Sequence, residues 1–189
     1  MNKTLHAKDR LIERFGLSPH PEGGYYRETH RDSSRVVRVA SQGAESGEPS
    51  AAGATARSAS TCIYYMLCDG AYSAWHRIRS DEIWHFYAGD PIDVHVLDGA
   101  GQLVTYRLGD ALARDDAAFQ VVVPAGRWFA AERVALADVA EPNGFSFVGC
   151  TVAPGFEFSE FELGDIDTLL GQCPSHAALI RRLAPRAAG

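Results

Sequence analysis

The sequence lacks the features that would direct a chain to a membrane or to nucleic acid. It contains no run of about 18 apolar residues, so we expect no membrane-spanning helix. Its formal net charge is −6, and its basic residues gather only in short runs such as 35–38, which argues against a nucleic-acid-binding surface. Residues 1–10 are polar and lack the apolar stretch of a signal peptide, so we expect a cytoplasmic protein.

Cysteines are few, and none of them forms a C-x-x-C pair or a zinc-knuckle spacing. The four are Cys62, Cys68, Cys150 and Cys173. We therefore expect reduced and mostly buried thiols rather than disulfides. With 189 residues, of which 46% are hydrophobic and 22% charged, the chain is long enough to bury its own core, and we predict one soluble domain over residues 1–189.

Short strand patterns fill most of the sequence. Glycine, aspartate, proline or asparagine separates them at intervals of about 8–12 residues, which is typical of a β-sandwich or barrel. One strand is predicted over residues 25–30, where aromatic and β-branched side chains gather. Nine more are predicted at 61–67, 71–78, 82–87, 92–97, 103–108, 119–123, 128–133, 145–152 and 158–162.

Helical patterns flank these strands at both ends of the chain. Residues 7–16 place apolar side chains at helical spacing, and Gly16 is suited to end the helix in a left-handed conformation. From Asp165 onward the pattern is helical again, and Pro174 divides it in two. We predict a short N-terminal helix and two C-terminal pieces.

The segment 41–60 differs from the rest in composition. It consists almost entirely of glycine, alanine, serine, glutamate and proline, which cannot bury an apolar face. We predict a flexible surface loop. A tolerated insertion is the simpler interpretation, and a lid over a pocket is the alternative.

The stretch from residue 70 to residue 89 carries a recognisable spacing. Gly70 is followed by His76, Glu82 and Gly89. This spacing resembles the first motif of the cupin superfamily, G-x5-H-x-H-x3-4-E-x6-G, except that Ile78 occupies the position of the second histidine. The resemblance predicts where the pocket of the protein lies.

A typical cupin metal site takes two histidines and a glutamate from that motif and one histidine from a second motif, G-x5-P-x-G-x2-H-x3-N. Residues 124–126 supply the P-x-G, but Ala118, Phe129 and Arg133 stand at the glycine, histidine and asparagine positions. Since Ile78 and Phe129 cannot bind a metal, two of the four expected ligands are missing. We predict no metal and no other cofactor, with a degenerate metal-dependent enzyme as the alternative.

Four further blocks extend the resemblance over most of the chain. They are HPEGGYYRE at 20–28, IYYML at 63–67, SDEIWHF at 80–86 and APGFEF at 153–158. Together they are similar to the DUF985, or cupin-5, family. The resemblance implies an all-β double-stranded β-helix, the cupin or jelly-roll barrel, similar in fold to deoxysugar-nucleotide epimerases and paired as a homodimer. It also implies that Glu22, Arg27 or Glu28 contributes to the site or to the dimer contact, but it implies no established reaction.

Strand alternation predicts which side chains face the cavity. In an extended segment 71–78, Tyr72 and His76 share one face. In the next strand Glu82, Trp84 and Phe86 share a face. Pairing of these two strands in a barrel would project His76 and Glu82 into one cavity.

A histidine beside a carboxylate either binds a metal or acts in acid–base chemistry. The predicted ligand-binding residues are Tyr72, His76, Glu82, Trp84, Phe86 and Phe129. Each has a structural alternative: His76 could be hydrogen-bonded within the barrel, the aromatic residues could be plain lining, and Tyr72 could be a core residue with its hydroxyl at the rim.

We therefore predict a metal-independent barrel that binds a small polar metabolite, such as a nucleotide or a sugar derivative. As an enzyme it would be an isomerase or epimerase, with His76 as base, Glu82 orienting it and Tyr72 as acid. A non-catalytic binding or sensing module is the second hypothesis. Neither nucleic acid nor a membrane is an expected partner.

Overall fold

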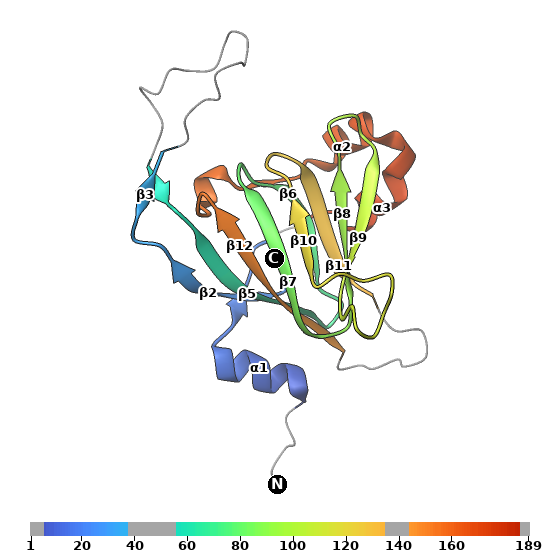
Figure 1. The fold of residues 1–189 in the computed structure, drawn as a ribbon. Helices are drawn as coiled ribbons and strands as arrows, with labels where there is room; N and C mark the ends of the chain where they lie inside the picture. Colours follow the sequence, from blue (N-terminus) through green and yellow to red (C-terminus); the bar gives the residue numbers. More distant parts are fainter. Residues whose placement is uncertain (1–5, 38–55, 135–143, 186–189) are drawn as a thin grey trace.

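Two β-sheets face each other in the computed structural model, which describes residues 6–37, 56–134 and 144–185 (Figure 1). The larger sheet has the order β1 (Ser18–Pro19), β2 (Tyr25–Arg31), β5 (Thr61–Cys68), β12 (Phe145–Ala153), β7 (Asp81–Gly89) and β10 (Gln120–Val123). The smaller sheet has the order β13 (Glu162–Leu163), β6 (Tyr72–Arg77), β11 (Trp128–Arg133), β8 (Ile92–Leu97) and β9 (Leu103–Leu108). All neighbouring strands in these sheets pair antiparallel, and the expected double-stranded β-helix is confirmed.

The main core lies between the two sheets. Inward-facing side chains alternate along the strands, as Ile92, Val94 and Val96 do on β8. Two large aromatic residues, Trp84 from β7 and Phe129 from β11, are almost fully buried in the same core. Burial of these rings removes much apolar surface from water and fixes the distance between the sheets.

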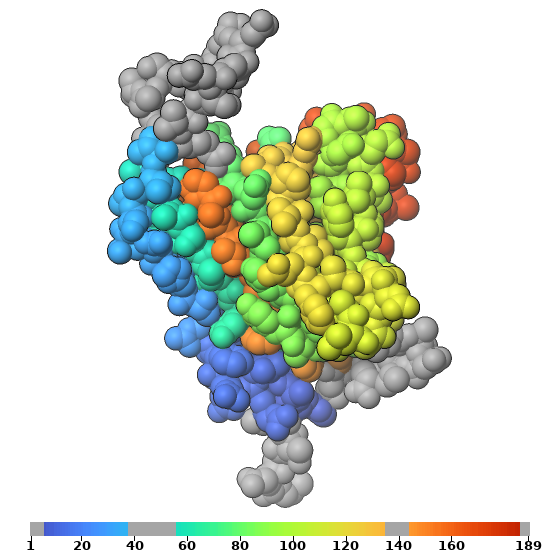
Figure 2. Space-filling model, viewed as in Figure 1, coloured from blue at the N-terminus to red at the C-terminus, as the bar shows by residue number. Residues whose placement is uncertain are grey.

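The predicted helices occur at both ends of the chain. Helix α1 (Ala7–Phe15) ends at Gly16, whose φ of 58° is the left-handed conformation expected there. Its apolar face packs against Met66 and Phe147 of the larger sheet. In Figure 2 this helix lies below the strands, and the C-terminal helices lie beside β8 and β9.

The C-terminal helices cover the outer face of the smaller sheet. Helix α2 (Ile166–Gln172) begins after Asp165, whose carboxylate accepts a hydrogen bond from the Thr168 backbone N–H at 2.9 Å. The break at Pro174 starts the 3₁₀-helix η2 (Pro174–His176), and α3 (Ala177–Arg182) follows. Together these elements bury a second apolar cluster against Trp75.

A β-bulge in β6 changes which side chains face the core. His76 pairs with Phe129, but Ser73 pairs with Ala131, so β6 contains one extra residue between the two pairs. As a result Ser73 and His76 both point inward, and the prediction that Tyr72 shares the face of His76 is wrong. The Tyr72 hydroxyl instead donates to the carbonyl of Ala184 at 2.8 Å.

The strand predicted over 158–162 is also wrong in part. The structure has the 3₁₀-helix η1 (Phe158–Glu160), followed by the two-residue strand β13. A helical turn brings Phe158 and Phe161 to the same side, so their rings pack on each other instead of alternating across a sheet.

Most of the loop predicted over 41–60 lies outside the described residues. Residues 56–60 are described, and there the prediction of an exposed segment fails. Arg57 and Ser58 form β4 (Arg57–Ser58), which pairs with β3 (Arg35–Val36), and both residues are buried. The burial of Arg57 is possible because Glu160 forms an ion pair with it at 2.5 Å.

The four cysteines all lie in the described part of the chain as free thiols, and three of them are buried. Among the helices described, none combines the length and the apolar character needed to cross a bilayer.

Candidate functional site

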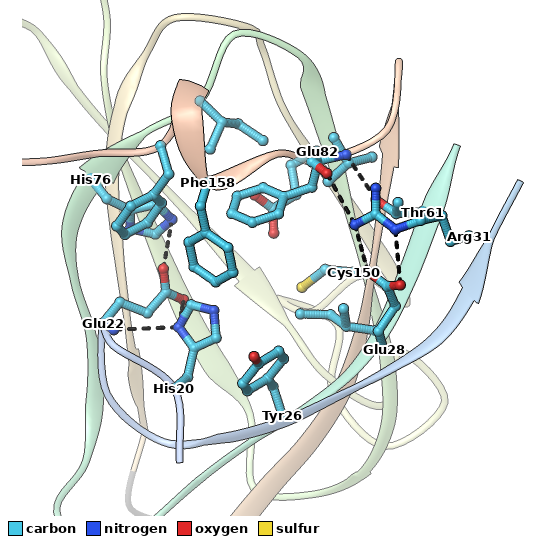
Figure 3. A pocket seen from close by; sticks show the side chains of 15 residues that line it. His20, Glu22, Tyr26, Glu28, Arg31, Thr61, His76, Glu82, Cys150 and Phe158 are labelled. Carbon is cyan, nitrogen blue, oxygen red and sulfur yellow. Dashed lines mark hydrogen bonds and ion pairs between the residues drawn. The ribbon is translucent and has the colours of Figure 1, made fainter. Parts of the chain in front are cut away.

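A cavity of about 290 Å³ lies between the two sheets beside η1 (Figure 3). Its volume is at the lower end of the roughly 300–1,000 Å³ of typical small-molecule pockets. Its ionisable lining residues are His20, Glu22, Glu28, Arg31, His76 and Glu82. Its aromatic lining residues are Tyr26, Phe156, Phe158 and Phe161. The cavity therefore combines apolar walls with a few polar groups.

The structure places the predicted site residues in three different environments. His76 and Glu82 both line the cavity. Phe129 lies behind His76, with ring centroids 4.0 Å apart, and Trp84 lies deeper in the core with Phe86 packed nearby. None of these three aromatic residues lines the cavity itself.

Tyr72, the remaining predicted site residue, does not line the cavity either. Its ring packs against the apolar cluster under the C-terminal helices, on the outer side of the smaller sheet. The β6 bulge therefore removes Tyr72 from the candidate acids.

Glu22 enters the cavity from the turn between β1 and β2, and strand alternation gave no reason to expect it there. Its Oε2 lies 3.1 Å from Nε2 of His76, and its Oε1 accepts a hydrogen bond from Ser73 Oγ at 2.9 Å. Its side chain is only 8% exposed. The family resemblance did include Glu22 among the residues that contribute to the site or to a dimer contact.

The turn that carries Glu22 needs glycine at the next position. Gly23 has a φ of 114°, and a Cβ there would lie 2.1 Å from the backbone oxygen of Tyr72. The Tyr65 hydroxyl donates to the Gly23 carbonyl at 2.8 Å and holds the turn from the other side. The HPEGG sequence is therefore a signal for a fixed turn that aims a carboxyl group into the barrel.

The proton positions of His76 follow from its two contacts. Its Nδ1 lies 2.7 Å from the carbonyl oxygen of Ala74, and a carbonyl only accepts, so Nδ1 carries a proton. Nε2 lies 3.1 Å from Oε2 of the Glu22 carboxyl group. Burial lowers the pKa of His76 to about 4 and raises the pKa of Glu22. Both shifts favour the uncharged forms of the two groups, and neutral His76 keeps an unprotonated Nε2.

Glu82 is a second carboxyl group that holds its proton at neutral pH. Burial raises the pKa of Glu82 to about 8, and a negative charge on Glu22, whenever it forms, adds to this rise. The thiol of Cys150 donates to this carboxyl group, and burial keeps the pKa of Cys150 well above its usual value. Glu82 can therefore donate a hydrogen bond or a proton to a molecule in the cavity.

Arg31 lies at the mouth of the cavity and is bound by two other carboxylates. Its Nε and Nη2 donate to both oxygens of Glu28 at 3.0 and 2.8 Å. Its Nη1 donates to Glu157 at 2.9 Å, and the Phe156 carbonyl accepts a further bond. Arg31 thus connects β2 to the segment that precedes η1.

The aromatic wall is built by three phenyl rings that contact one another. Phe158 lies 5.0 Å from Phe156 and 6.2 Å from Phe161, measured between ring centroids. Phe161 continues the wall to the ring of His76, 5.3 Å away. Figure 3 shows Phe158 in the space between Glu22 and Glu82, and it is 54% exposed.

The residues present do not fit the usual cupin metal site. Ile78 lines the cavity where the second histidine would stand, and Phe129 takes the place of the last one. Both ring nitrogens of His76 are engaged, by Ala74 and by Glu22. Within the described ranges, no three histidine, cysteine, aspartate or glutamate side chains gather as a metal site requires. We derive no chemical step through a metal.

Comparison with known proteins identifies the fold and the family. Two solved structures match over almost the whole chain, each at 32% sequence identity and with 96% of this chain covered. One is a protein from Shewanella oneidensis, of which 98% is covered, with a TM-score of 0.75. The other is a hypothetical protein from Leishmania major, covered completely, with a TM-score of 0.77.

A more distant match shows the fold alone. Oxalate decarboxylase from Bacillus subtilis is 12% identical, with a TM-score of 0.50, and the match covers 89% of this chain but 37% of the enzyme. No match is found among curated proteins. The expected likeness to deoxysugar-nucleotide epimerases is not shown by these comparisons. The family model described as "Cupin superfamily (DUF985)" matches residues 9–164, and the chain therefore belongs to that family.

Proposed function

We propose that the protein binds a small polar metabolite in the barrel cavity and transfers protons on it without a metal, as an isomerase or epimerase does. The observation that carries this proposal is the close approach of His76 to Glu22, 3.1 Å apart, in the same cavity as the protonated carboxyl group of Glu82. One group is placed to accept a proton and another to give one.

The proton balance of such a reaction needs only these side chains. Nε2 of His76 would take one proton from a carbon of the metabolite, and the carbonyl of Ala74 would stabilise the resulting imidazolium through Nδ1. Glu82 would deliver its own proton at another position of the same molecule. The metabolite is then isomerised, and exchange with solvent removes the extra proton from His76 and returns one to Glu82.

The cavity volume favours a small metabolite over a nucleotide or a nucleotide sugar. A space of about 290 Å³ is at the small end of ligand pockets, although a larger molecule could extend beyond its mouth. The aromatic wall supports binding of a molecule with an apolar face as well as polar groups.

Hydrogen exchange in D₂O tests the proposal. The wild-type protein is incubated with a panel of small metabolites, and mass spectrometry measures deuterium incorporated at carbon. We expect incorporation in at least one compound and a loss of about 100-fold or more in Glu82→Gln. Exposed Glu162, which pairs with Arg77 outside the cavity, provides the control variant Glu162→Gln.

A non-catalytic binding module would give a different result in the same experiment. It would bind a compound, as shown by a thermal shift that disappears in Glu82→Gln, without any exchange at carbon. Binding without exchange would therefore reject the isomerase part of the proposal and retain the ligand site.

The homodimer implied by the family stays a prediction. Light scattering of the purified protein would test it, since a mass near 20.5 kDa would identify a monomer and contradict the prediction.

A further inference from the structure

We infer that the ligand of this cavity carries a positively charged amine, held between the carboxyl groups of Glu22 and Glu82 and the aromatic wall of Phe156, Phe158 and Phe161. The inference rests on the proposed function, because it takes the cavity to be a ligand site. It names the chemical class of ligand, a small organic ammonium compound.

The first support is the charge of the cavity lining. Three carboxyl groups, from Glu22, Glu28 and Glu82, line it together with a single guanidinium, that of Arg31. Both histidines that line it have pKa values lowered by burial, so they add no positive charge at neutral pH. A ligand that binds here must therefore be compatible with a lining that has more carboxyl groups than guanidinium groups.

Arg31 does not balance the deeper carboxyl groups. Its guanidinium is bound on one side by both oxygens of Glu28 and on another by Glu157. In the described part of the chain, no lysine or arginine forms an ion pair with Glu22 or Glu82; the only ion-pair contacts of Glu22 there are with His20 and His76. The interior therefore lacks a cation for two buried carboxyl groups.

A buried carboxylate without a cation is unfavourable, and an empty cavity avoids it by keeping protons. Glu82 is 8% exposed, and its pKa is raised to about 8. An ammonium ligand would take the place of the proton and allow the carboxylate to form. A bound ammonium group would thus compensate both for the raised pKa of Glu82 and for the excess of carboxyl groups.

The second support is independent of charge and comes from the aromatic wall. The faces of phenyl rings attract cations within roughly 6 Å of their centres. Phe158 is 54% exposed although it lines the cavity, so its ring is available for contact with a ligand. Tyr26 adds a fourth ring to the lining. Carboxyl groups and several aromatic rings around one small space are the elements of an ammonium site.

Other classes of ligand fit less well. An anion would meet Glu22 and Glu82 in the interior and would find Arg31 already bound by two carboxylates. A neutral polyol would need hydrogen-bond partners for hydroxyls on every side, and three phenyl rings form one wall of the cavity. These classes are the competing outcomes of the test.

A matched pair of compounds tests the inference by calorimetry. Choline and its uncharged isostere 3,3-dimethylbutan-1-ol have nearly the same shape but differ in charge. Ethanolamine and putrescine, with ethylene glycol and butane-1,4-diol as neutral counterparts, cover smaller and longer amines. We expect at least one amine to bind about tenfold or more tightly than its neutral counterpart at pH 8.

Variants then locate the binding. Glu82→Gln should weaken amine binding about tenfold or more, and Phe158→Leu, which keeps apolar bulk, should weaken it about three- to fivefold. Glu162→Gln and Phe119→Leu are the matched controls, since both residues lie outside the cavity and are partly exposed. Circular dichroism verifies that each variant is folded.

The pH dependence gives a second readout with a defined sign. Glu82 faces the Cys150 thiol from β12 and Glu22 from the β1–β2 turn, and Glu22 faces His20, Tyr65, Ser73 and His76. Of these groups Glu82, whose pKa is raised to about 8, releases its proton between pH 6 and pH 8 when a cation binds. The affinity for choline, whose charge does not change with pH, should therefore rise from pH 6 to pH 8 by up to about tenfold per unit for each proton released.

The outcomes separate this inference from the proposed function. Equal binding of amines and neutral counterparts, tighter binding of oxalate or a sugar, or no amine binding at millimolar concentration would overturn the ammonium inference. The proposed function is judged by proton exchange at carbon instead, so it can survive with another class of ligand or fail while amine binding persists.

Discussion

Two histidine–glutamate pairs in the described part of the chain have the same separation, but they differ in location and in the charges around them. In the cavity, His76 Nε2 lies 3.1 Å from Glu22, and on the outer face of the smaller sheet, His95 Nε2 lies 3.1 Å from Glu132. Arg182 of α3 forms an ion pair with the other oxygen of Glu132. The outer pair therefore has a cation, whereas the inner pair has none.

The difference in charge sets opposite proton states. Burial acts to raise the pKa of Glu132, but the hydrogen bonds from His95 and Arg182 outweigh it, and the pKa of Glu132 is lowered. For Glu22 burial prevails and the pKa is raised. The outer carboxylate is thus a structural anion that ties α3 to the sheet, while burial favours the protonated form of the inner carboxyl group. Distance alone does not distinguish a structural pair from a chemical one.

The largest expected effect is a change in the free energy of unfolding with pH, which should depend on Glu82 and not on Glu132. The pKa of Glu82 is about 8 in the folded protein and about 4.5 ordinarily, so between these values the folded state holds a proton that the unfolded chain has lost. The free energy of unfolding must therefore fall as pH rises, by about 1.4 kcal/mol per unit from this group, or about 4 kcal/mol between pH 5 and pH 8.

Urea unfolding at several pH values measures this slope. Glu82→Gln is uncharged at every pH and should lose the contribution of Glu82, so that at pH 8 it is more stable than wild type by several kcal/mol. Glu132→Gln should keep the slope. Because the pKa of Glu132 is lowered, its stabilising contribution is present above its ordinary value and is lost only as pH falls through the folded value. Parallel curves for wild type and Glu82→Gln would contradict the assignment.

A smaller difference is expected between the variants Glu132→Gln and Glu22→Gln when their free energies of unfolding are measured at pH 6. Glu132→Gln removes a charge that His95 and Arg182 contact, and because Arg182 is 58% exposed we expect a loss of only about 1 kcal/mol. Glu22→Gln retains an oxygen for Ser73 and keeps an uncharged group beside His76, so its change should stay within about 0.5 kcal/mol. The reverse order of these two losses would show that the inner pair is ionised.

The smallest effect concerns Ser73, which donates to Glu22 and thereby lowers its pKa against the larger effect of burial. Ser73→Ala should raise the pKa of Glu22 further and change the free energy of unfolding by only about 0.5 kcal/mol. Titration followed by NMR of labelled glutamate carboxyl carbons measures the shift. Ser80→Ala, which removes a bond to the Pro154 carbonyl elsewhere, should leave the Glu22 titration unchanged.

Much of the barrel could be predicted from alternation and turn residues. The strands over 92–97, 103–108 and 128–133 have the predicted bounds, because a turn with glycine, aspartate or proline precedes each of them, and Ile92–Leu97 also alternates apolar with polar side chains. The spacing of Gly70, His76, Glu82 and Gly89 also predicted that His76 and Glu82 reach one cavity.

The features that were predicted wrongly or missed depend on contacts between residues that are distant in sequence. The bulge that turns Tyr72 outward is set by pairing of β6 with β11, and no residue pattern within β6 predicts it. Glu22 reaches His76 from a turn far earlier in the chain. Burial of Arg57 depends on Glu160, about one hundred residues later in the sequence. Local patterns carry none of this information.

The link between Arg31 and the segment at 156–157 has a consequence for folding and for ligand response. The cavity is closed by residues near the start of the chain and by residues near its end, joined through this guanidinium. A molecule bound there would contact both parts at once and stabilise them together. Amide hydrogen exchange in β2 and η1 should then slow in concert on binding, so that two segments distant in sequence respond as one cooperative unit.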